Sequence, residues 1–333
     1  MTTLVTGAAG FIGFHTTRRL LDDGHDILAI DNLDPYYDPS LKAARLEALG
    51  LTAAGGQSET HPGLRFAPAD LTDPEAIASA LGDTPIDAIV HLAAQVGVRY
   101  SIEHPKAYID SNLVGFGAIC ELARAHSVSH LVYASSSSVY GGNTEVPFRT
   151  DHRVDQPISL YAATKRANEL MAHAYSHLHE LPTTGLRFFT VYGPFGRPDM
   201  AYFSFTRKIL AGEPIDVFNH GEMSRDFTYV DDIVEGIVRV LGRPPTTAQG
   251  VPYRLYNLGN GSPVGLRDFI SAIEDALGQR AQLNLTGMQP GDMAHTWADT
   301  TALEEDHGYR PATPLSEGVA AFVDWYRAYY DQG

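Results

Sequence analysis

The sequence has very little cysteine and no long hydrophobic run. Cys120 is the only cysteine among 333 residues, which excludes an internal disulfide and is typical of a reducing compartment. No apolar stretch approaches the roughly 20 residues that a membrane-spanning helix needs. The chain opens on a strand-like pattern instead of a signal peptide. We therefore expect a cytoplasmic protein that does not enter a membrane, with Cys120 buried as a small apolar side chain.

Basic residues are also scarce. The chain has 24 Lys and Arg residues against 40 Asp and Glu residues, a formal net charge of -16. This balance argues against nucleic acid or an anionic membrane surface as a partner, but a few local Arg residues or a helix N-terminus can still hold a phosphorylated small molecule. No His, Cys and Asp cluster has the spacing of a metal site, so we expect no metal.

A glycine-rich turn stands close to the N-terminus. Thr2 to Thr6 reads as a short buried strand, and Gly7, Gly10 and Gly13 lead from it into a helical pattern. The first glycine permits a tight turn, the second lets the backbone approach a pyrophosphate, and the third lets helix and strand pack closely. Amides at the helix start then face the phosphates. This arrangement predicts a dinucleotide site.

Asp31 ends the second predicted strand, Asp26 to Ile30, and follows Gly7 by 24 residues. At this place a carboxylate accepts hydrogen bonds from the adenosine ribose and repels a 2′-phosphate. The sequence therefore favours NAD over NADP.

Two further strands, Leu64 to Ala67 and Ala88 to Leu92, each end beside candidate cofactor contacts. Asp70 and Leu71 follow the first, where the adenine edge is read, although Asp70 also suits a helix-capping turn. Leu92, Ala93 and Ala94 end the second, where small residues let a cofactor pass. His91 is expected to be a packed core histidine.

A serine run follows the next strand. A long helix from Pro105 to Ala125 leads to the strand Leu131 to Ala134 and then to Ser135-Ser136-Ser137-Ser138. Side chains alternate along an extended segment, so Ser136 and Ser138 should face one way. Ligands of open parallel sheets bind at the carboxyl ends of strands, which makes these two serines candidates to touch a reacting hydroxyl.

Tyr161 and Lys165 stand four residues apart on the predicted helix Leu160 to His179, so both side chains point into one site. A neighbouring ammonium favours the phenolate form of tyrosine. Tyr161 could then act as a general base toward a sugar or alcohol hydroxyl while a hydride leaves the same carbon.

Six strands alternating with helices predict an α/β fold, a doubly wound parallel Rossmann-type sheet followed by a smaller C-terminal mixed α/β domain. We expect residues 1–190 to bind NAD and to carry the Tyr161 helix, and residues 191–333 to bind the substrate. The chain is free to cross between them. Helices are expected at Phe203 to Ala211, Asp231 to Leu241, Leu266 to Leu277 and Leu315 to Tyr330.

Taken together, these features resemble the extended short-chain dehydrogenase/reductase family. The resemblance is most specific to its UDP-glucuronate 4-epimerases in the segments 93–100 (AAQVGVRY), 135–141 (SSSSVYG), 159–165 (SLYAATK), 196–201 (GRPDMA), 224–232 (SRDFTYVDD) and 289–292 (QPGD). It implies tightly held NAD, a UDP-sugar substrate and a homodimer formed through the helices near 105–125 and 160–178.

The resemblance also implies residue roles. Tyr161 and Lys165 would be catalytic together with Ser136 and Ser138. Cofactor contacts would extend to Phe11, Ile12, Asn32, Ser135 and Phe188. Substrate contacts would come from Arg99, Thr190, Arg197, Arg225, Gln289 and Asp292, with Arg197 and Thr190 gripping a sugar carboxylate and Arg225 meeting the diphosphate.

This chain departs from three related groups of enzymes. Serines replace the Asp-Glu pair of 4,6-dehydratases, and Ser138 replaces the Glu usual in UDP-glucuronate decarboxylases. Thr190 and Gln289 stand where galactose-type epimerases tend to have Asn and Arg. A UDP-glucose/UDP-galactose 4-epimerase, a decarboxylase and a non-catalytic NAD-binding sensor remain the alternatives.

Overall fold

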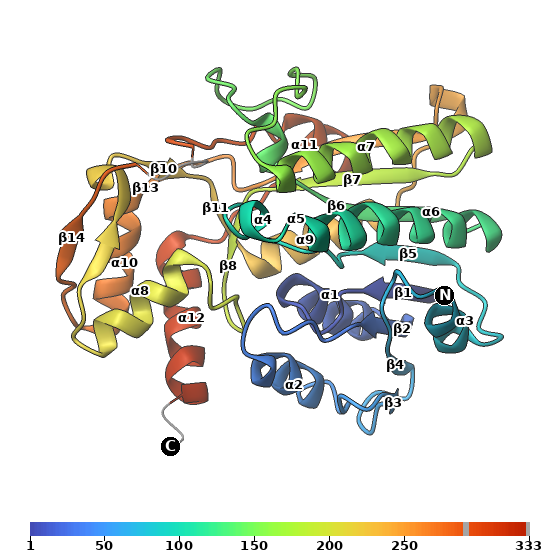
Figure 1. The fold of residues 1–333 in the computed structure, drawn as a ribbon, viewed down its shortest axis with the longest axis horizontal. Coiled ribbons are helices and arrows are strands. Elements are labelled where there is room, and N and C mark those ends of the chain that lie inside the picture. The colour runs from blue at the N-terminus through green and yellow to red at the C-terminus, as the bar shows by residue number, and fades with distance from the viewer. Residues whose placement is uncertain (289–292, 331–333) are drawn as a thin grey trace. The chain divides into compact units, whose positions relative to one another are not determined.

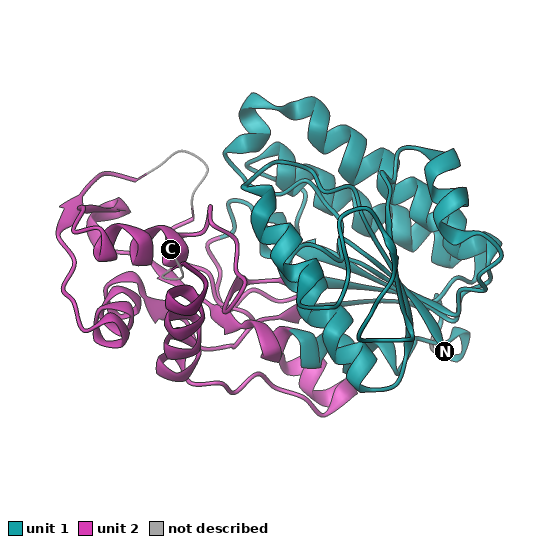
Figure 2. Ribbon diagram, turned by 90° about the horizontal axis from the view of Figure 1, so that it is seen from below, with its two compact units in different colours: residues 1–143, 151–187, 234–256 teal, residues 144–150, 188–233, 257–333 magenta. Residues whose placement is uncertain are grey.

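The computed structural model describes residues 1–288 and 293–330. The chain forms two compact units, shown in different colours in Figure 2. Unit 1 contains residues 1–143, 151–187 and 234–256, and unit 2 contains residues 144–150, 188–233 and 257–333. The chain crosses between the units more than once, because residues 234–256 return to unit 1, where residues 253–256 form most of an edge strand of its sheet.

An eight-stranded sheet in the order β12-β7-β6-β5-β1-β2-β4-β3 forms the centre of unit 1. Leu4 of β1 pairs in parallel with Leu28 of β2 and with Ile89 of β5. This order and the parallel pairing confirm the predicted doubly wound fold, although a short antiparallel strand, β3, was not expected. The strands are β1 (Thr2–Thr6), β2 (Asp26–Asp31), β3 (Gly56–Gln57), β4 (Leu64–Pro68), β5 (Ala88–His91), β6 (His130–Ser136), β7 (Thr183–Phe188) and β12 (Tyr253–Leu258).

Helices cover this sheet, and α6 and α7 run side by side in Figure 1. The expected helix from 105 to 125 is interrupted by a π-helical segment, Ile109–Val114. The helix α7 has its predicted bounds, and the Ser159 hydroxyl caps it by accepting from the amide of Ala162 at 3.1 Å. The helices are α1 (Phe11–Asp22), α2 (Pro39–Glu47), α3 (Pro74–Leu81), α4 (Tyr100–Glu103), α5 (Pro105–Tyr108), α6 (Gly115–Ala125) and α7 (Leu160–His179).

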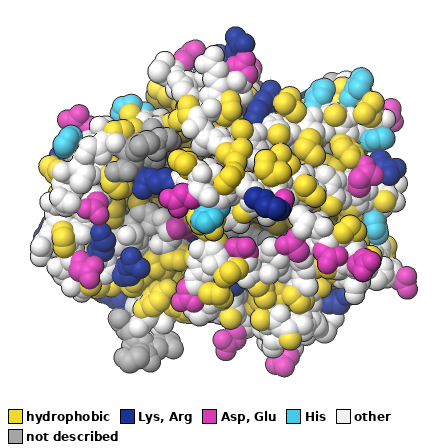
Figure 3. Space-filling model, in the orientation of Figure 1, with side chains coloured by type: hydrophobic (Ala, Val, Ile, Leu, Met, Phe, Trp, Pro, Cys, Tyr) yellow, Lys and Arg dark blue, Asp and Glu magenta, His cyan; other side chains and the backbone are white. Residues whose placement is uncertain are grey.

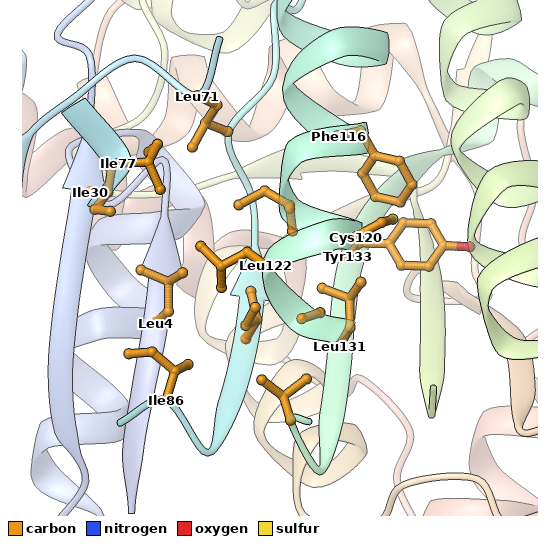
Figure 4. Close-up of a cluster of buried hydrophobic side chains, with 14 of the residues drawn as sticks. Leu4, Ile30, Leu71, Ile77, Ile86, Phe116, Cys120, Leu122, Leu131 and Tyr133 are labelled. Carbon is orange, nitrogen blue, oxygen red and sulfur yellow. The ribbon is translucent and has the colours of Figure 1, made fainter. Parts of the chain in front are cut away.

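Aliphatic and aromatic side chains from the sheet and from α3, α6 and α7 form one core of unit 1, part of which is drawn in Figure 4. Phe116 packs edge-to-face on Tyr133 with ring centres 5.2 Å apart. Cys120 lies in this core with none of its surface exposed, and burial raises the pKa of its thiol to about 12. The prediction that Cys120 is a buried apolar residue is therefore confirmed.

Unit 2 has a separate core that is rich in aromatic rings, including Phe227 stacked on Phe269 at 3.8 Å. Its helices match the expected ones closely, with α11 as an addition, and α9 continues into unit 1. Within the described ranges, no helix is long and apolar enough to cross a membrane. The elements are β8 (Thr190–Tyr192), α8 (Ala201–Leu210), β9 (Ile215–Val217), β10 (Ser224–Arg225), β11 (Phe227–Tyr229), α9 (Val230–Leu241), β13 (Val264–Gly265), α10 (Leu266–Leu277), β14 (Leu283–Leu285), α11 (Thr301–His307) and α12 (Leu315–Tyr330).

Candidate active site

In the glycine turn between β1 and α1, backbone atoms lie so close to Gly7 and Gly13 that neither position has room for a side chain. A Cβ on Gly7 would lie 2.7 Å from the amide nitrogen of Ala93, and one on Gly13 would lie 2.0 Å from the carbonyl oxygen of Gly7. Gly7 also has a φ of +73°, which other residues rarely adopt. The turn therefore brings the end of β5 against the start of α1.

The first turn of α1 fits the diphosphate of a dinucleotide. Gly10 is the N-cap residue and offers no side chain to cap the helix. The amides of Phe11 and Ile12 belong to the first turn, where a helix provides no carbonyl partners. Such amides and the positive end of the helix dipole favour an anion. Together with a turn that has no space for a Cβ, these groups are compatible with bound NAD.

Asp31 lies at the end of β2 and is 5 % exposed. It accepts hydrogen bonds from the amide of Leu33 at 2.8 Å, from the amide of Ala9 in the glycine turn at 3.1 Å, and from Nζ of Lys42 at 3.0 Å. This carboxylate therefore fixes the glycine turn as well as being a candidate for the ribose. Lys42 was not predicted, because nothing in the sequence of α2 marks one lysine as a partner of Asp31.

Asn32 and Asp70 form a pair at neighbouring strand ends, with Nδ2 donating to Oδ2 at 2.9 Å. The other oxygen of Asp70 accepts from the amide and hydroxyl of Thr72. Although burial opposes ionisation, these hydrogen bonds lower the pKa of Asp70. Leu71 is 8 % exposed and its side chain belongs to the core of unit 1. The capping residue of α3 is Asp73, so Asp70 serves a turn rather than a cap.

Three candidate cofactor residues follow the end of β5. Leu92, Ala93 and Ala94 are all partly exposed. His91 before them is 2 % exposed, and its Nδ1 lies 2.8 Å from the hydroxyl of Thr6. Burial, with a smaller effect of the positive charge on Lys165, lowers the pKa of His91 to about 3. His91 is the packed core histidine that was predicted.

The serine run is not extended throughout, so the alternation expected along 135–138 is wrong beyond Ser136. The strand β6 ends at Ser136, and residues Ser137–Tyr140 form a 3₁₀ turn. We call residues 135–140 the serine turn. Ser136 and Ser138 still adjoin, because the Ser136 hydroxyl accepts from the amide of Ser138 at 3.1 Å and contacts its hydroxyl at 3.1 Å. The side chain of Ser135 points elsewhere and donates to Glu169 at 2.7 Å.

The helix α7 carries Tyr161 and Lys165 one turn apart and packs against β6 and the serine turn. Lys165 is 2 % exposed, and its Nζ donates to the carbonyl oxygen of Ala134 in β6 at 2.9 Å. Burial lowers the pKa of this amine to about 8. Tyr161 is partly exposed, with its ring edge-to-face on Tyr108 at 6.1 Å. A phenol and an amine are thus available next to a strand end that carries two hydroxyls.

Unit 2 carries most of the candidate substrate residues. Thr190 opens β8, and Phe188 ends β7 with 8 % of its surface exposed. Arg197 forms an ion pair with Asp199. Arg225 donates to the carbonyl oxygens of Ser224 at 3.1 Å and of Ala294 at 3.0 Å.

Asp226, which follows Arg225 in the sequence, is not a surface residue. It is completely buried and accepts from the amides of Asn260, Gly261 and Ala298. Arg99, in unit 1, is exposed before α4. Gln289 and Asp292 lie outside the described residues.

Comparisons with known proteins show the family to which the chain belongs. Residues 3–259 match the NAD dependent epimerase/dehydratase family. A probable UDP-glucuronate 4-epimerase of Rhizobium meliloti is 47% identical over 98% of this chain and 97% of its own length. A protein of Escherichia coli O111:H- without a stated activity is 53% identical over 98% of both chains.

A solved structure is also similar along the whole chain. The UDP-glucuronic acid 4-epimerase of Bacillus cereus, crystallised with UDP-glucuronic acid and NAD, superposes with a TM-score of 0.88. The two sequences are 31% identical, and the superposition covers 99% of this chain and 100% of the other. With a family match over residues 3–259 and relatives of 47% identity, the chain belongs to the NAD dependent epimerase/dehydratase family.

Proposed function

We propose that the protein is a UDP-glucuronate 4-epimerase that interconverts UDP-glucuronate and UDP-galacturonate. The observation that carries this proposal is the arrangement of α7, in which Tyr161 stands one turn from a buried Lys165 that reaches the end of β6. A relative named for this activity at 47% identity, and a similar structure that holds UDP-glucuronic acid and NAD, support the substrate.

The residues divide the chemistry among them. Tyr161 removes the proton from the 4-hydroxyl of the sugar and later returns it. The ammonium of Lys165 favours the phenolate and holds the nicotinamide ribose. Ser136, with Ser138 beside it, hydrogen-bonds the hydroxyl and the ketone that develops from it. NAD, when held by the glycine turn and Lys165, would supply an acceptor for the hydride from carbon 4 and a donor that returns it to the opposite face, so that no net oxidation would occur.

Different residues contact different parts of NAD in this proposal. The glycine turn and the first turn of α1 hold the diphosphate, Asp31 and Asn32 hold the adenosine ribose, and Asp70 and Leu71 border the adenine. Leu92, Ala93, Ala94, Ser135 and Phe188 border the remainder of the cofactor, Ser135 through its backbone.

A uronate substrate adds a difficulty, because its 4-keto form is a β-keto acid that loses carbon dioxide when its carboxylate stands perpendicular to the ketone. We assign the grip on this carboxylate to Arg197 and Thr190. A guanidinium can bind a carboxylate at two points and so control its orientation. Arg225 is assigned to the diphosphate, and Arg99, Gln289 and Asp292 complete the substrate set.

Product analysis tests the proposed function directly. Purified protein is incubated with UDP-glucuronate, UDP-glucose and UDP-xylose in separate reactions without added reductant, and the nucleotide sugars are separated. Conversion of UDP-glucuronate to UDP-galacturonate alone supports the proposal. Conversion of UDP-glucose instead supports a UDP-glucose/UDP-galactose 4-epimerase, and release of UDP-xylose from the uronate supports a decarboxylase. NAD bound without any turnover supports a sensor.

We also propose a homodimer. Four exposed apolar side chains stand on the helical segment 109–125 and on α7: Ile109, Val114, Leu170 and Leu178, which are 40%, 53%, 56% and 70% exposed. Figure 3 shows hydrophobic side chains gathered over these helices. A second copy of the chain would remove this surface from water. A buried, unpaired Cys120 supports a location in the cytoplasm.

A further inference from the structure

Glu169 lies one turn beyond Lys165 on α7 and is completely buried. Tyr161, Lys165 and Glu169 are spaced four residues apart, so they form one stripe along the helix. Buried carboxylates are rare and require partners. The partners of Glu169 come from three different elements, and none of their side chains has a part in the proposed reaction.

The first partner is Ser135, whose hydroxyl donates to Oε1 of Glu169 at 2.7 Å. The second is Arg187 of β7, which donates from Nε to Oε1 at 2.8 Å and from Nη2 to Oε2 at 2.9 Å. Arg166 adds a contact to Oε2 at 2.9 Å from the partly exposed side. Ser135 and Arg187 are 2% and 1% exposed. Although burial opposes ionisation, Arg187 and Ser135 hold the pKa of Glu169 below its usual value.

Arg187 also reaches the other end of the serine turn. Its guanidinium lies 4.9 Å from the ring centre of Tyr140, which is 1% exposed. Ser135 begins the serine turn and Tyr140 ends it. Glu169 and Arg187 therefore contact both ends of the serine turn, which contains Ser136 and Ser138. Through Glu169 these contacts link the turn to α7, the helix that carries Tyr161 and Lys165.

We propose that Glu169 is a positioning residue, which fixes the serine turn relative to Tyr161 and Lys165 through Ser135 and Arg187. This inference rests on the proposed function, since it concerns the same site. Catalysis by a preorganised group requires the hydroxyl and the base to keep a fixed geometry, and a displacement of about 1 Å can cost up to about 100-fold in rate. A purely structural ion pair would affect folding but not this geometry.

The test removes the link between Glu169 and the serine turn without removing a buried charge. Ser135→Ala deletes one hydroxyl and leaves the Glu169–Arg187 pair intact, whereas Glu169→Gln leaves the Arg187 charge buried without its partner and could prevent folding. The matched control is Ser176→Ala. Ser176 lies on the same helix, about 10 Å beyond Glu169 along its axis. It is completely buried, and its hydroxyl contacts the Thr183 hydroxyl of β7 at 2.8 Å.

Four quantities are measured with UDP-glucuronate: kcat, KM, the content of bound NAD and the melting temperature. For Ser135→Ala we expect kcat to fall at least about tenfold, while KM, NAD content and melting temperature stay close to those of Ser176→Ala. Ser135→Thr, which keeps the hydroxyl, should recover part of kcat. A Ser135→Ala enzyme with the kcat of the control, or one whose NAD content and melting temperature fall together with kcat, overturns the inference. Wild-type protein that leaves UDP-glucuronate unconverted overturns the proposed function and this inference with it.

Discussion

Arg197 and Asp199 form a two-point ion pair across Pro198. Nε of Arg197 donates to Oδ1 of Asp199 at 3.0 Å, and Nη2 donates to Oδ2 at 2.6 Å. The two side chains are 23% and 28% exposed, so the pair is neither fully solvated nor fully buried. Because Asp199 holds one edge of the planar guanidinium, it fixes the plane in which Arg197 presents its other donors. The arginine that we assign to the sugar carboxylate is thus oriented by its own loop.

The first prediction concerns this arginine. Arg197→Ala should raise KM for UDP-glucuronate about 10- to 100-fold, the usual effect of losing charge-assisted hydrogen bonds. It should also release some UDP-pentose, because the carboxylate of the keto intermediate is no longer held in the ketone plane. Separation of the nucleotide sugars by chromatography measures both effects. Arg153→Ala is the control, since Arg153 forms an exposed pair with Asp155 at the same spacing. Unchanged KM together with no pentose would count against the carboxylate grip.

The second prediction concerns the general base. Tyr161→Phe should lower kcat by about a hundredfold to ten-thousandfold, the range typical of general acid–base catalysis, and leave the Kd of the UDP-sugar within a small factor. Tyr175→Phe is the control, because Tyr175 is a phenol on the same helix, about 21 Å further along its axis, and its hydroxyl contacts Glu121. Turnover rates and calorimetric Kd values are compared for the two variants. A Tyr161→Phe enzyme of near-normal rate would remove the base assignment.

The third prediction concerns acid stability. His91 has a pKa of about 3 in the folded protein, chiefly because it is buried, and an ordinary pKa of about 6.5 in an unfolded chain. Below pH 6.5 the unfolded chain therefore binds a proton that the folded protein does not. Stability is lost as the pH falls from about 6.5 to 3, by about 1.4 kcal/mol per pH unit once the unfolded histidine is charged. Above pH 6.5 this contribution is constant.

His91→Asn removes that proton uptake. The variant should be less stable than wild type at pH 7, because it leaves a cavity. Its free energy of unfolding should fall less steeply between pH 6.5 and 4.5, by about 1 kcal/mol per pH unit. Urea unfolding at several pH values measures this slope, with the exposed His177→Asn as control. Parallel slopes for His91→Asn and wild type would show that His91 does not titrate in this way.

Local patterns account for what the sequence predicted well. The glycine turn is a strand, three glycines and a helix in direct succession, and each glycine has a steric reason that holds wherever the turn is placed. The helix α7 has a capping serine at one end and consistent helical spacing along its length. Tyr161 and Lys165 then share a face by helix geometry alone.

The sequence did not predict two kinds of feature: irregular helical segments and contacts between separate elements. The 3₁₀ turn after Ser136 and the π-helical segment Ile109–Val114 have no sequence signature that alternation or helical spacing can reveal. Lys42 meets Asp31 only because α2 folds back on β2. In the sequence, Glu169 is one polar residue among several on a helix. Only the fold shows that Arg187 of β7 lies beside it.

The fourth prediction concerns the glycine turn. Gly13→Ala should lose bound NAD, because its Cβ would lie 2.0 Å from the carbonyl oxygen of Gly7 and the turn would have to open. Gly242→Ala is the control, with its nearest atom at an ordinary 3.7 Å. The NAD released from each purified variant by denaturation is quantified against protein. A Gly13→Ala protein with a full complement of NAD would contradict the assignment of this turn to the diphosphate.

The fifth prediction concerns the proposed dimer. Val114→Glu combined with Leu170→Glu places two carboxylates on the apolar surface of the 109–125 segment and α7. In a dimer interface these carboxylates would lose their hydration without gaining partners. The free-energy cost would prevent association through an interface of ordinary size, about 800 Å² per subunit. In a monomer both side chains are solvated and the change costs little, because Val114 and Leu170 are 53% and 56% exposed.

Light scattering after gel filtration gives the mass of each protein. We expect wild type to have twice the mass of one chain and the double variant to have the mass of one chain, with an unchanged circular dichroism spectrum. Leu283→Glu is the control, because Leu283 is a similarly exposed leucine, 45% exposed, on β14 of unit 2. A monomeric wild type, or a double variant that stays dimeric, would show that this apolar surface does not join two copies of the chain.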